Sequence, residues 1–209
     1  EAARLWTGKA AAHAERRTAV MMGFTQREKD AALVKLMRNS RGFSLDALRK
    51  LLKKGAKPDV VTADSCWVLC FIGLFGYYVD FRDAAVRLLV EFGADVNRVN
   101  PDGSRPLDYF LRDRDEAILR FLLLMGAYTH IKDGHGLMPL QRAIDGGEWR
   151  AVGALVDYGA DVRERHPVSG DRALMQALRK NAFFHGYTIA TLKKIIDQSV
   201  SVINEADST

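Results

Sequence analysis

The chain has 209 residues, of which 48% are hydrophobic and 27% charged, a composition that excludes a disordered segment. Its two cysteines are too few for a disulfide framework. The most apolar stretch, residues 66–79, is shorter than the roughly 18–20 residues of a membrane-spanning helix. We expect a buried helix there, with Cys66 and Cys70 as small apolar side chains. A metal or redox pair is disfavoured, because no second Cys or His pair lies at ligand spacing.

The net charge of +5 is unevenly distributed. Residues 1–60 carry 14 Lys or Arg against 6 Asp or Glu, whereas residues 61–209 carry 17 against 20. A local excess of this kind predicts a basic patch in the N-terminal part of the chain. No basic start leads into an apolar run, so we find no signal peptide and expect a cytoplasmic or nuclear piece of a longer protein.

A motif of the form Leu-Leu-x-x-Gly-Ala recurs along the chain and ends at Gly55, Gly93, Gly126 and Gly159. These glycines are separated by 38, 33 and 33 residues. A period in the low thirties is typical of stacked repeats, in which each unit buries its apolar face against its neighbours. Such a chain presents a long surface and has no central catalytic pocket.

In chain order, residues 1–23 are rich in alanine, and we expect a helical cap over the first end of the stack. The repeat domain is predicted over 24–209. Its units are expected at 24–56, 57–94, 95–127, 128–160 and 161–200, with a remnant at 201–209. The second unit is longer, and we place its extra residues at 76–80.

Each unit follows the same order of turn, first helix, second helix and glycine. In the third unit the turn over 98–103 precedes a first helix that opens at Pro106, where a missing N–H costs nothing. A second helix begins near Glu116, whose charge suits a helix N-terminus, and ends at Gly126 in a left-handed conformation. Later first helices are predicted from Met138 and over 172–180, and later second helices over 148–158 and 187–198.

Residues 93–97 (Gly-Ala-Asp-Val-Asn) and the pairs Pro106-Leu107 and Pro139-Leu140 resemble the ankyrin repeat family. The resemblance implies an all-α solenoid of helix-turn-helix units with short β-hairpin tips. It also implies a non-enzymatic protein-binding module, part of a larger scaffold or regulatory protein. The family's helix-opening Thr is replaced by Arg105, Met138 and Arg172, and its His by Asp108, Gln141 and Met175. We therefore expect weakened helix caps, with Ser104 or Asp171 as substitutes.

No catalytic motif is found. The five histidines are scattered, and neither a nucleophile elbow, a phosphate-binding loop nor a metalloprotease motif is present. The chain is therefore predicted to be no enzyme and to have no cofactor, metal or small-molecule substrate.

The resemblance places partner contacts on the concave front, which first helices and hairpins form. The hairpin candidates are Arg98, Asp102, Lys132, His135, Arg165 and His166. The first-helix candidates are Arg112, Asp113, Asp145, Arg179 and Lys180.

A basic face is predicted on the second helix of the first unit. Spacings of one, three and four residues bring its members to one broad side of that helix. They are Arg49, Lys50, Lys53, Lys54 and Lys57. The face is either an ordinary solvated surface or a platform for anionic lipid or nucleic acid, and the lack of interleaved aromatic residues disfavours nucleic acid. A further alternative is a regulatory domain of an enzyme located elsewhere in the parent chain.

Overall fold

The computed structural model describes residues 25–39, 43–62, 66–74, 81–111, 116–180 and 186–206. These residues form ten α-helices and no β-strand, so the predicted all-α class is confirmed for them. No helix in this part of the chain is long and apolar enough to cross a membrane. The predicted cap at 1–23 and the extra residues at 76–80 lie outside the described residues.

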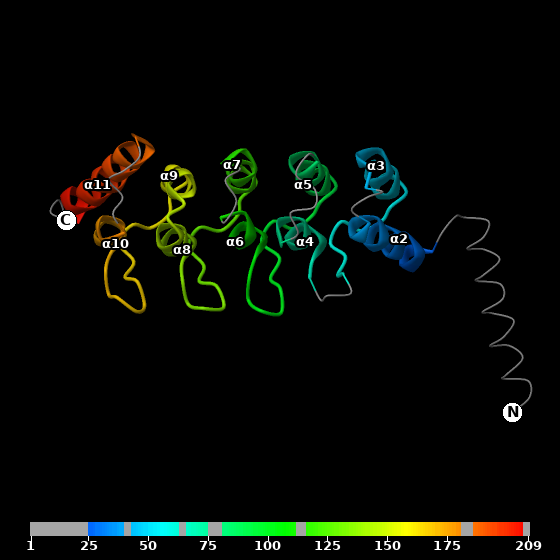
Figure 1. Cartoon of the computed structure of the whole chain (residues 1–209), viewed down its shortest axis with the longest axis horizontal. Helices are drawn as coiled ribbons and strands as arrows, with labels where there is room; N and C mark the ends of the chain where they lie inside the picture. The colour runs from blue at the N-terminus through cyan, green and yellow to red at the C-terminus, as the bar shows by residue number, and fades with distance from the viewer. Residues whose placement is uncertain are drawn as a thin grey trace, which may run out of the picture.

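The helices follow one another in five pairs, arranged side by side along the long axis of the molecule (Figure 1). The first members form one row: α2 (Gln26–Arg38), α4 (Val68–Leu74), α6 (Pro106–Phe110), α8 (Pro139–Gly146) and α10 (Ala173–Arg179). The second members form a parallel row: α3 (Leu45–Lys53), α5 (Arg82–Glu91), α7 (Glu116–Leu124), α9 (Trp149–Asp157) and α11 (Gly186–Ala206). Within the second row each helix packs against the next, so one apolar core runs between the two rows.

Glycine ends the second helix of each of the first four pairs, as the recurring motif predicts. Gly126 has φ +86°, in the left-handed region. Its N–H donates to the carbonyl of Leu123, and the N–H of Ala127 donates to the carbonyl of Leu122, both at 3.0 Å. This pair of bonds is a Schellman cap, which satisfies carbonyls that the helix end leaves open. The same geometry recurs at the other three motif glycines.

The first helices are capped by a side chain three residues inside the helix. The N–H of Arg105 donates to Asp108 Oδ2 at 2.8 Å, and that of Met138 to Gln141 Oε1 at 3.0 Å. The expected substitution by Ser104 or Asp171 is wrong, because Arg105 and Arg172 occupy the N-cap positions. No Thr side chain accepts a bond at the N-cap positions of α6 and α8. The other bond of a capping box, from the N-cap N–H to a side chain inside the helix, is present.

Between successive pairs the chain forms four projections that we call fingers: finger 1 (57–62 with 66–67), finger 2 (94–105), finger 3 (127–138) and finger 4 (160–172). They extend from the first-helix row to one side of the molecule (Figure 1). Backbone bonds close each finger, for example from Asn100 N–H to the Ser104 carbonyl at 2.8 Å. The expected β-hairpins are not formed in the described fingers, because their arms pair too briefly for a ladder. Only an isolated bridge between Val61 and Trp67 is present there.

The two cysteines and the last helix also bear on the predictions. Cys66 and Cys70 are buried and unoxidised, as expected for small apolar side chains. The hydrogen bond with Cys66 and burial both raise the pKa of the Cys70 thiol, which disfavours the reactive thiolate.

At the C-terminal end of the described residues, α11 runs without a break through the predicted boundary at residue 200. The expected remnant is therefore not a separate element up to residue 206.

Candidate interaction surface

The first helices and the fingers together form one long face of the molecule, which we call the front. Five of the candidate contact residues are exposed on fingers 2, 3 and 4. They are Arg98, Asp102, Lys132, His135 and Arg165. Arg112 and Asp113 lie outside the described residues.

Fingers 1 and 2 are joined by Trp67. Its indole Nε1–H donates to the Val99 carbonyl at 2.8 Å, and its backbone N–H donates to Asn100 Oδ1 at 3.1 Å. The guanidinium carbon of Arg98 lies 4.2 Å from the centroid of the indole ring, a cation–π contact. Arg98 is therefore exposed but held in place, and Trp67 is a front residue that the sequence reasoning missed.

Fingers 2, 3 and 4 are also tied to one another. Arg105 Nη1 donates to the Lys132 carbonyl at 3.4 Å, and Lys132 Nζ lies 2.8 Å from Glu164 Oε1. Asp102 is used within its own finger, where Oδ1 accepts from the Ser104 N–H at 2.9 Å. These bonds hold fingers 2, 3 and 4 in a fixed arrangement.

His166 lies at the start of the turn that closes finger 4, but it is buried, so its expected exposure to a partner is wrong. Its Nδ1 accepts from the N–H groups of Val168 and Ser169, both at 3.2 Å. Nε2 lies 3.0 Å from Asp145 Oδ2. Every polar atom of the ring therefore has an internal partner, and His166 shapes the finger from within.

The remaining first-helix candidates lie close together on α8 and α10. Lys180 Nζ donates to the Asp145 carbonyl at 3.1 Å, and Gln176 Nε2 donates to Asp145 Oδ1 at 2.9 Å. Arg179 pairs with Asp171 at 3.2 Å and is otherwise exposed. Lys180 and Arg179 thus keep exposed surface at the front, whereas Asp145 is a partly buried hub between the two helices.

A buried ion pair joins finger 3 to α8. Arg142 forms an ion pair with Asp133, whose side chain is 1% exposed. Asp133 Oδ1 also accepts from the N–H groups of His135 and Leu137, at 2.7 and 3.0 Å. Burial raises the pKa of the neighbouring Asp108, against the opposing hydrogen bond from Arg105 and the charge of Arg142. These groups hold the turn of finger 3 against α8.

The residues of the predicted basic face lie on α3 and just after it. The apolar side of this helix, with Leu48 and Leu52, is buried, and the opposite side is exposed. The exposed cations are Arg49, Lys50, Lys53, Lys54 and Lys57. Four of them have no carboxylate partner in the described part of the chain: Arg49, Lys50, Lys53 and Lys57. Helix α3 belongs to the second row (Figure 1), whereas Lys57 lies at the start of finger 1.

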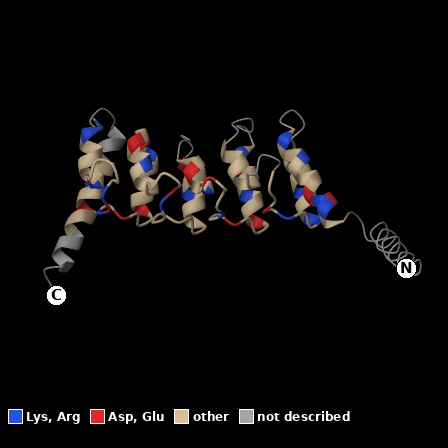
Figure 2. Ribbon diagram, turned by 90° about the horizontal axis from the view of Figure 1, so that it is seen from below, with Lys and Arg blue, Asp and Glu red and all other residues tan. Residues whose placement is uncertain are grey.

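The charge excess is concentrated in the first helix pair. The described residues of this pair, 25–39 and 43–62, hold nine Lys or Arg and four Asp or Glu, a net charge of +5, whereas the other described residues balance to zero. Figure 2 shows Lys and Arg gathered on the helix beside the N-terminal end. Any partner that reaches this end of the molecule meets a positive field.

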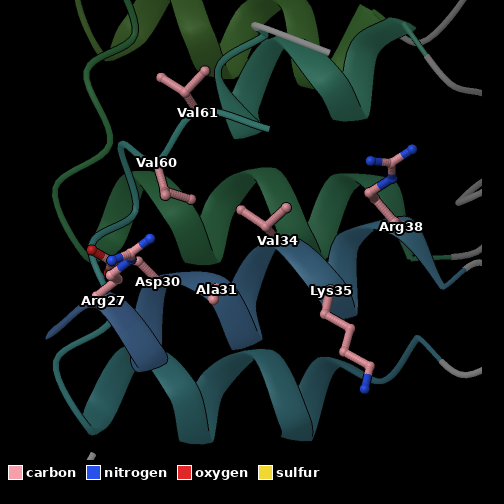
Figure 3. A pocket seen from close by; sticks show the side chains of 8 residues that line it. All are labelled: Arg27, Asp30, Ala31, Val34, Lys35, Arg38, Val60 and Val61. Carbon is pink, nitrogen blue, oxygen red and sulfur yellow. The ribbon is translucent and has the colours of Figure 1, made fainter. Parts of the chain in front are cut away.

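A hollow of about 510 Å³ lies between α2 and finger 1 (Figure 3). It is lined by Arg27, Asp30, Ala31, Val34, Lys35, Arg38, Val60 and Val61. The sequence reasoning missed it, because it combines residues of α2 with a finger more than 20 positions later. A smaller hollow, of about 320 Å³, lies beside Arg142 and Asp145. Within the described residues, no group of three or more His, Cys, Asp or Glu side chains is placed to hold a metal ion.

No protein-family model matches the chain. A curated protein from Arabidopsis thaliana, ADP-ribosylation factor GTPase-activating protein AGD2, is 39% identical to it over 62 residues. These residues are 30% of this chain and 8% of that protein, so the match covers less than a tenth of the relative.

Proposed function

We propose that the chain is a divergent ankyrin-repeat solenoid whose concave front binds another protein without catalysing a reaction. The observation that carries this proposal is the continuity of the front. Trp67, Arg105 and Lys132 tie each of the first three fingers to the next, and exposed polar side chains project from three of the four. A preorganised face of this length suits the recognition of an extended protein surface.

The repeat assignment is supported by three features that recur together. Paired helices stand in a row, left-handed glycines cap four second helices, and fingers project on one side. Buried polar side chains in the finger turns, such as Asp133 and His166, are occupied by internal bonds. The groups that remain available to a partner at the front are therefore exposed charged side chains and amides.

The similarity to AGD2 bears on the parent protein more than on this chain. That relative is named as a GTPase-activating protein, but the matched stretch is a small part of it. In the alternative function, this chain is a regulatory domain of an enzyme located elsewhere in its parent protein. In both cases we propose a cytoplasmic or nuclear scaffold or regulatory role for the domain.

The test uses the intact chain as bait and measures the affinity of the captured partner. We expect Lys132→Glu with Arg165→Glu, on fingers 3 and 4, to weaken binding at least tenfold and leave Tm within about 3 °C. The matched control, Arg49→Glu with Lys193→Glu, makes the same charge change on the second row and should leave the affinity within twofold. An equal loss of affinity in both variants, or no loss in either, contradicts binding at the front.

A second function is favoured by Arg49, Lys50 and Lys53 of α3, which have no carboxylate partner among the described residues. They suit an anionic lipid headgroup or the phosphates of a nucleic acid, both of which lose affinity steeply with salt through counterion release. Substitution of Arg49 and Lys50 by Glu, measured with anionic vesicles and with RNA at 50 and 200 mM salt, tests this role. Retained binding by the variant contradicts it.

A further inference from the structure

The hollow beside α2 has an apolar interior. Val34 lies at the middle of the helix, with Ala31 one turn before it, and Val60 and Val61 face them from finger 1 (Figure 3). Val61 is 42% exposed, so this apolar surface is open to solvent. Its volume of about 510 Å³ is within the roughly 300–1,000 Å³ of pockets that hold small ligands. One large apolar side chain and its flanking backbone fit such a space.

The rim of the hollow is positively charged at both ends. Figure 3 shows Arg27 at the start of α2 and Lys35 and Arg38 toward its end, with Val34 between them. Arg27 and Lys35 have no carboxylate partner among the residues that the structure describes. Asp30 is the acidic lining residue, and its Oδ1 already accepts from the Lys57 N–H at 2.8 Å and from Gln26 Nε2 at 2.7 Å.

The positive charge around the hollow indicates whether an acidic segment or a basic one occupies it. The first helix pair carries the whole net charge of the described residues, so an acidic segment is attracted to it. The chain's own residues 1–24 hold four Lys or Arg against two Asp or Glu and are therefore basic. They are repelled by the same rim, which disfavours them as the occupant.

We propose that this hollow receives one aliphatic or aromatic side chain of a partner protein, flanked on both sides by Asp or Glu. Arg27 and Lys35 are eight positions apart, which is about 12 Å along a helix. An extended peptide covers that distance in about four residues. The selected pattern is therefore acid-x-apolar-x-acid, with the apolar side chain over Ala31, midway between the two cations, and against Val34, and with one carboxylate at each end. This inference rests on the proposed function and names the partner chemistry at one end of the front.

The test is a titration of the ¹⁵N-labelled full chain with the peptide Ser-Glu-Ser-Leu-Ser-Glu-Ser, followed by amide chemical shifts. We expect saturable shifts in 27–38 and 60–61. A peptide with Ser in place of Leu should bind at least tenfold more weakly, and one with Lys in place of both Glu should not bind. Val34→Glu should abolish binding of the first peptide, with circular dichroism as the check on its folding.

A charge-reversal variant keeps the inference falsifiable if Val34→Glu does not fold. Arg27→Glu with Lys35→Glu changes exposed side chains, and it should bind the Lys peptide in preference to the Glu peptide. Arg49→Glu with Lys50→Glu, on the α3 face, is the matched control and should bind as the unaltered chain does.

Three results would overturn the inference: shifts centred on 45–57, equal binding of the peptide without Leu, or no saturable binding of the Glu peptide. The proposed function fails separately. If only the hollow is misassigned, the substitutions on fingers 3 and 4 still weaken the captured partner.

Discussion

His166 Nε2 and Asp145 Oδ2 lie 3.0 Å apart and join the turn of finger 4 to α8. Because Nδ1 accepts two backbone N–H groups, the ring hydrogen is on Nε2 and is donated to the carboxylate. Gln176 donates to the other oxygen of Asp145 at 2.9 Å. One carboxylate thus fixes a finger and two first helices, which keeps the neighbouring exposed side chains of the front in a constant arrangement.

The buried ion pair between Arg142 and Asp133 is a critical link. We expect Arg142→Met to lower the free energy of unfolding by about 3 kcal/mol, because it leaves a buried carboxylate without its counter-ion. Urea unfolding at pH 7 measures the change. Asp133→Asn combined with Arg142→Met should recover part of the loss, and the exposed Arg172→Met should cost less than about 0.5 kcal/mol. A loss below 1 kcal/mol in Arg142→Met would show that the pair is dispensable.

Asp108 combines a necessary hydrogen bond with a costly charge. Asn at this position keeps an acceptor for the Arg105 N–H and removes the buried charge, so Asp108→Asn should stabilise the protein by about 1 kcal/mol at pH 7. Since burial raises the folded pKa of Asp108, the carboxylate's penalty is absent in acid and appears as the pH rises. The advantage of Asn should therefore shrink toward pH 3.5 in urea unfolding series.

Asp108→Leu provides the counterpart, because it removes both the charge and the acceptor. It should destabilise the protein by about 1–3 kcal/mol. If Leu were as stable as Asn, the cap would contribute nothing.

Asp157 links three consecutive helices of the second row. Its carboxylate lies 3.0 Å from Arg120 on α7 and 2.5 Å from Lys194 on α11. Burial alone would raise the pKa of Asp157, but the bonds from Lys194 and Arg120 outweigh it and lower the pKa. Its contribution is therefore present above the unfolded pKa of about 3.9 and is lost as the pH falls through the lower folded value.

We expect Asp157→Asn to cost about 1 kcal/mol at pH 7 in low salt, and to cost nothing near pH 2. Asp197→Asn on α11 is the control, since that exposed carboxylate has no ion pair in the described structure. A cost for Asp157→Asn that does not change with pH would contradict the electrostatic explanation.

Gly126 tests the left-handed helix cap. Nothing lies within 4 Å of the position that a Cβ would take, so a side chain there meets conformational strain and no clash. Val should cost about 2 kcal/mol or more, because it is β-branched, whereas Asn tolerates this conformation and should cost less than about 1 kcal/mol. Thermal unfolding of both variants checks the order, and equal losses would contradict it.

The sequence predicted the helices and the glycines that end the second helices because these depend on local patterns. Gly126 and its counterparts need only a left-handed residue after a run of leucines, and Pro106 and Pro139 open helices by their own geometry. The buried contacts of the finger turns were not predictable in the same way. His166 is a polar residue in a turn, and its burial depends on Asp145 from another unit.

The hollow on α2 escaped the sequence for a related reason. Val34 continues an ordinary apolar helix pattern, and nothing in its neighbours indicates that Val60 and Val61 face it without filling the space. The absence of strands in the described fingers likewise follows from arm length, which the Asn, Asp, Pro and Gly composition of the turns does not fix.

Hydrogen–deuterium exchange of the complex with its captured protein tests the central claim most directly. If the front binds the partner, backbone amides of fingers 2, 3 and 4 exchange more slowly in the complex, while those of α5, α7 and α9 are unchanged. Slowed exchange confined to the second-row helices, with fingers that exchange as in the free chain, would contradict the account.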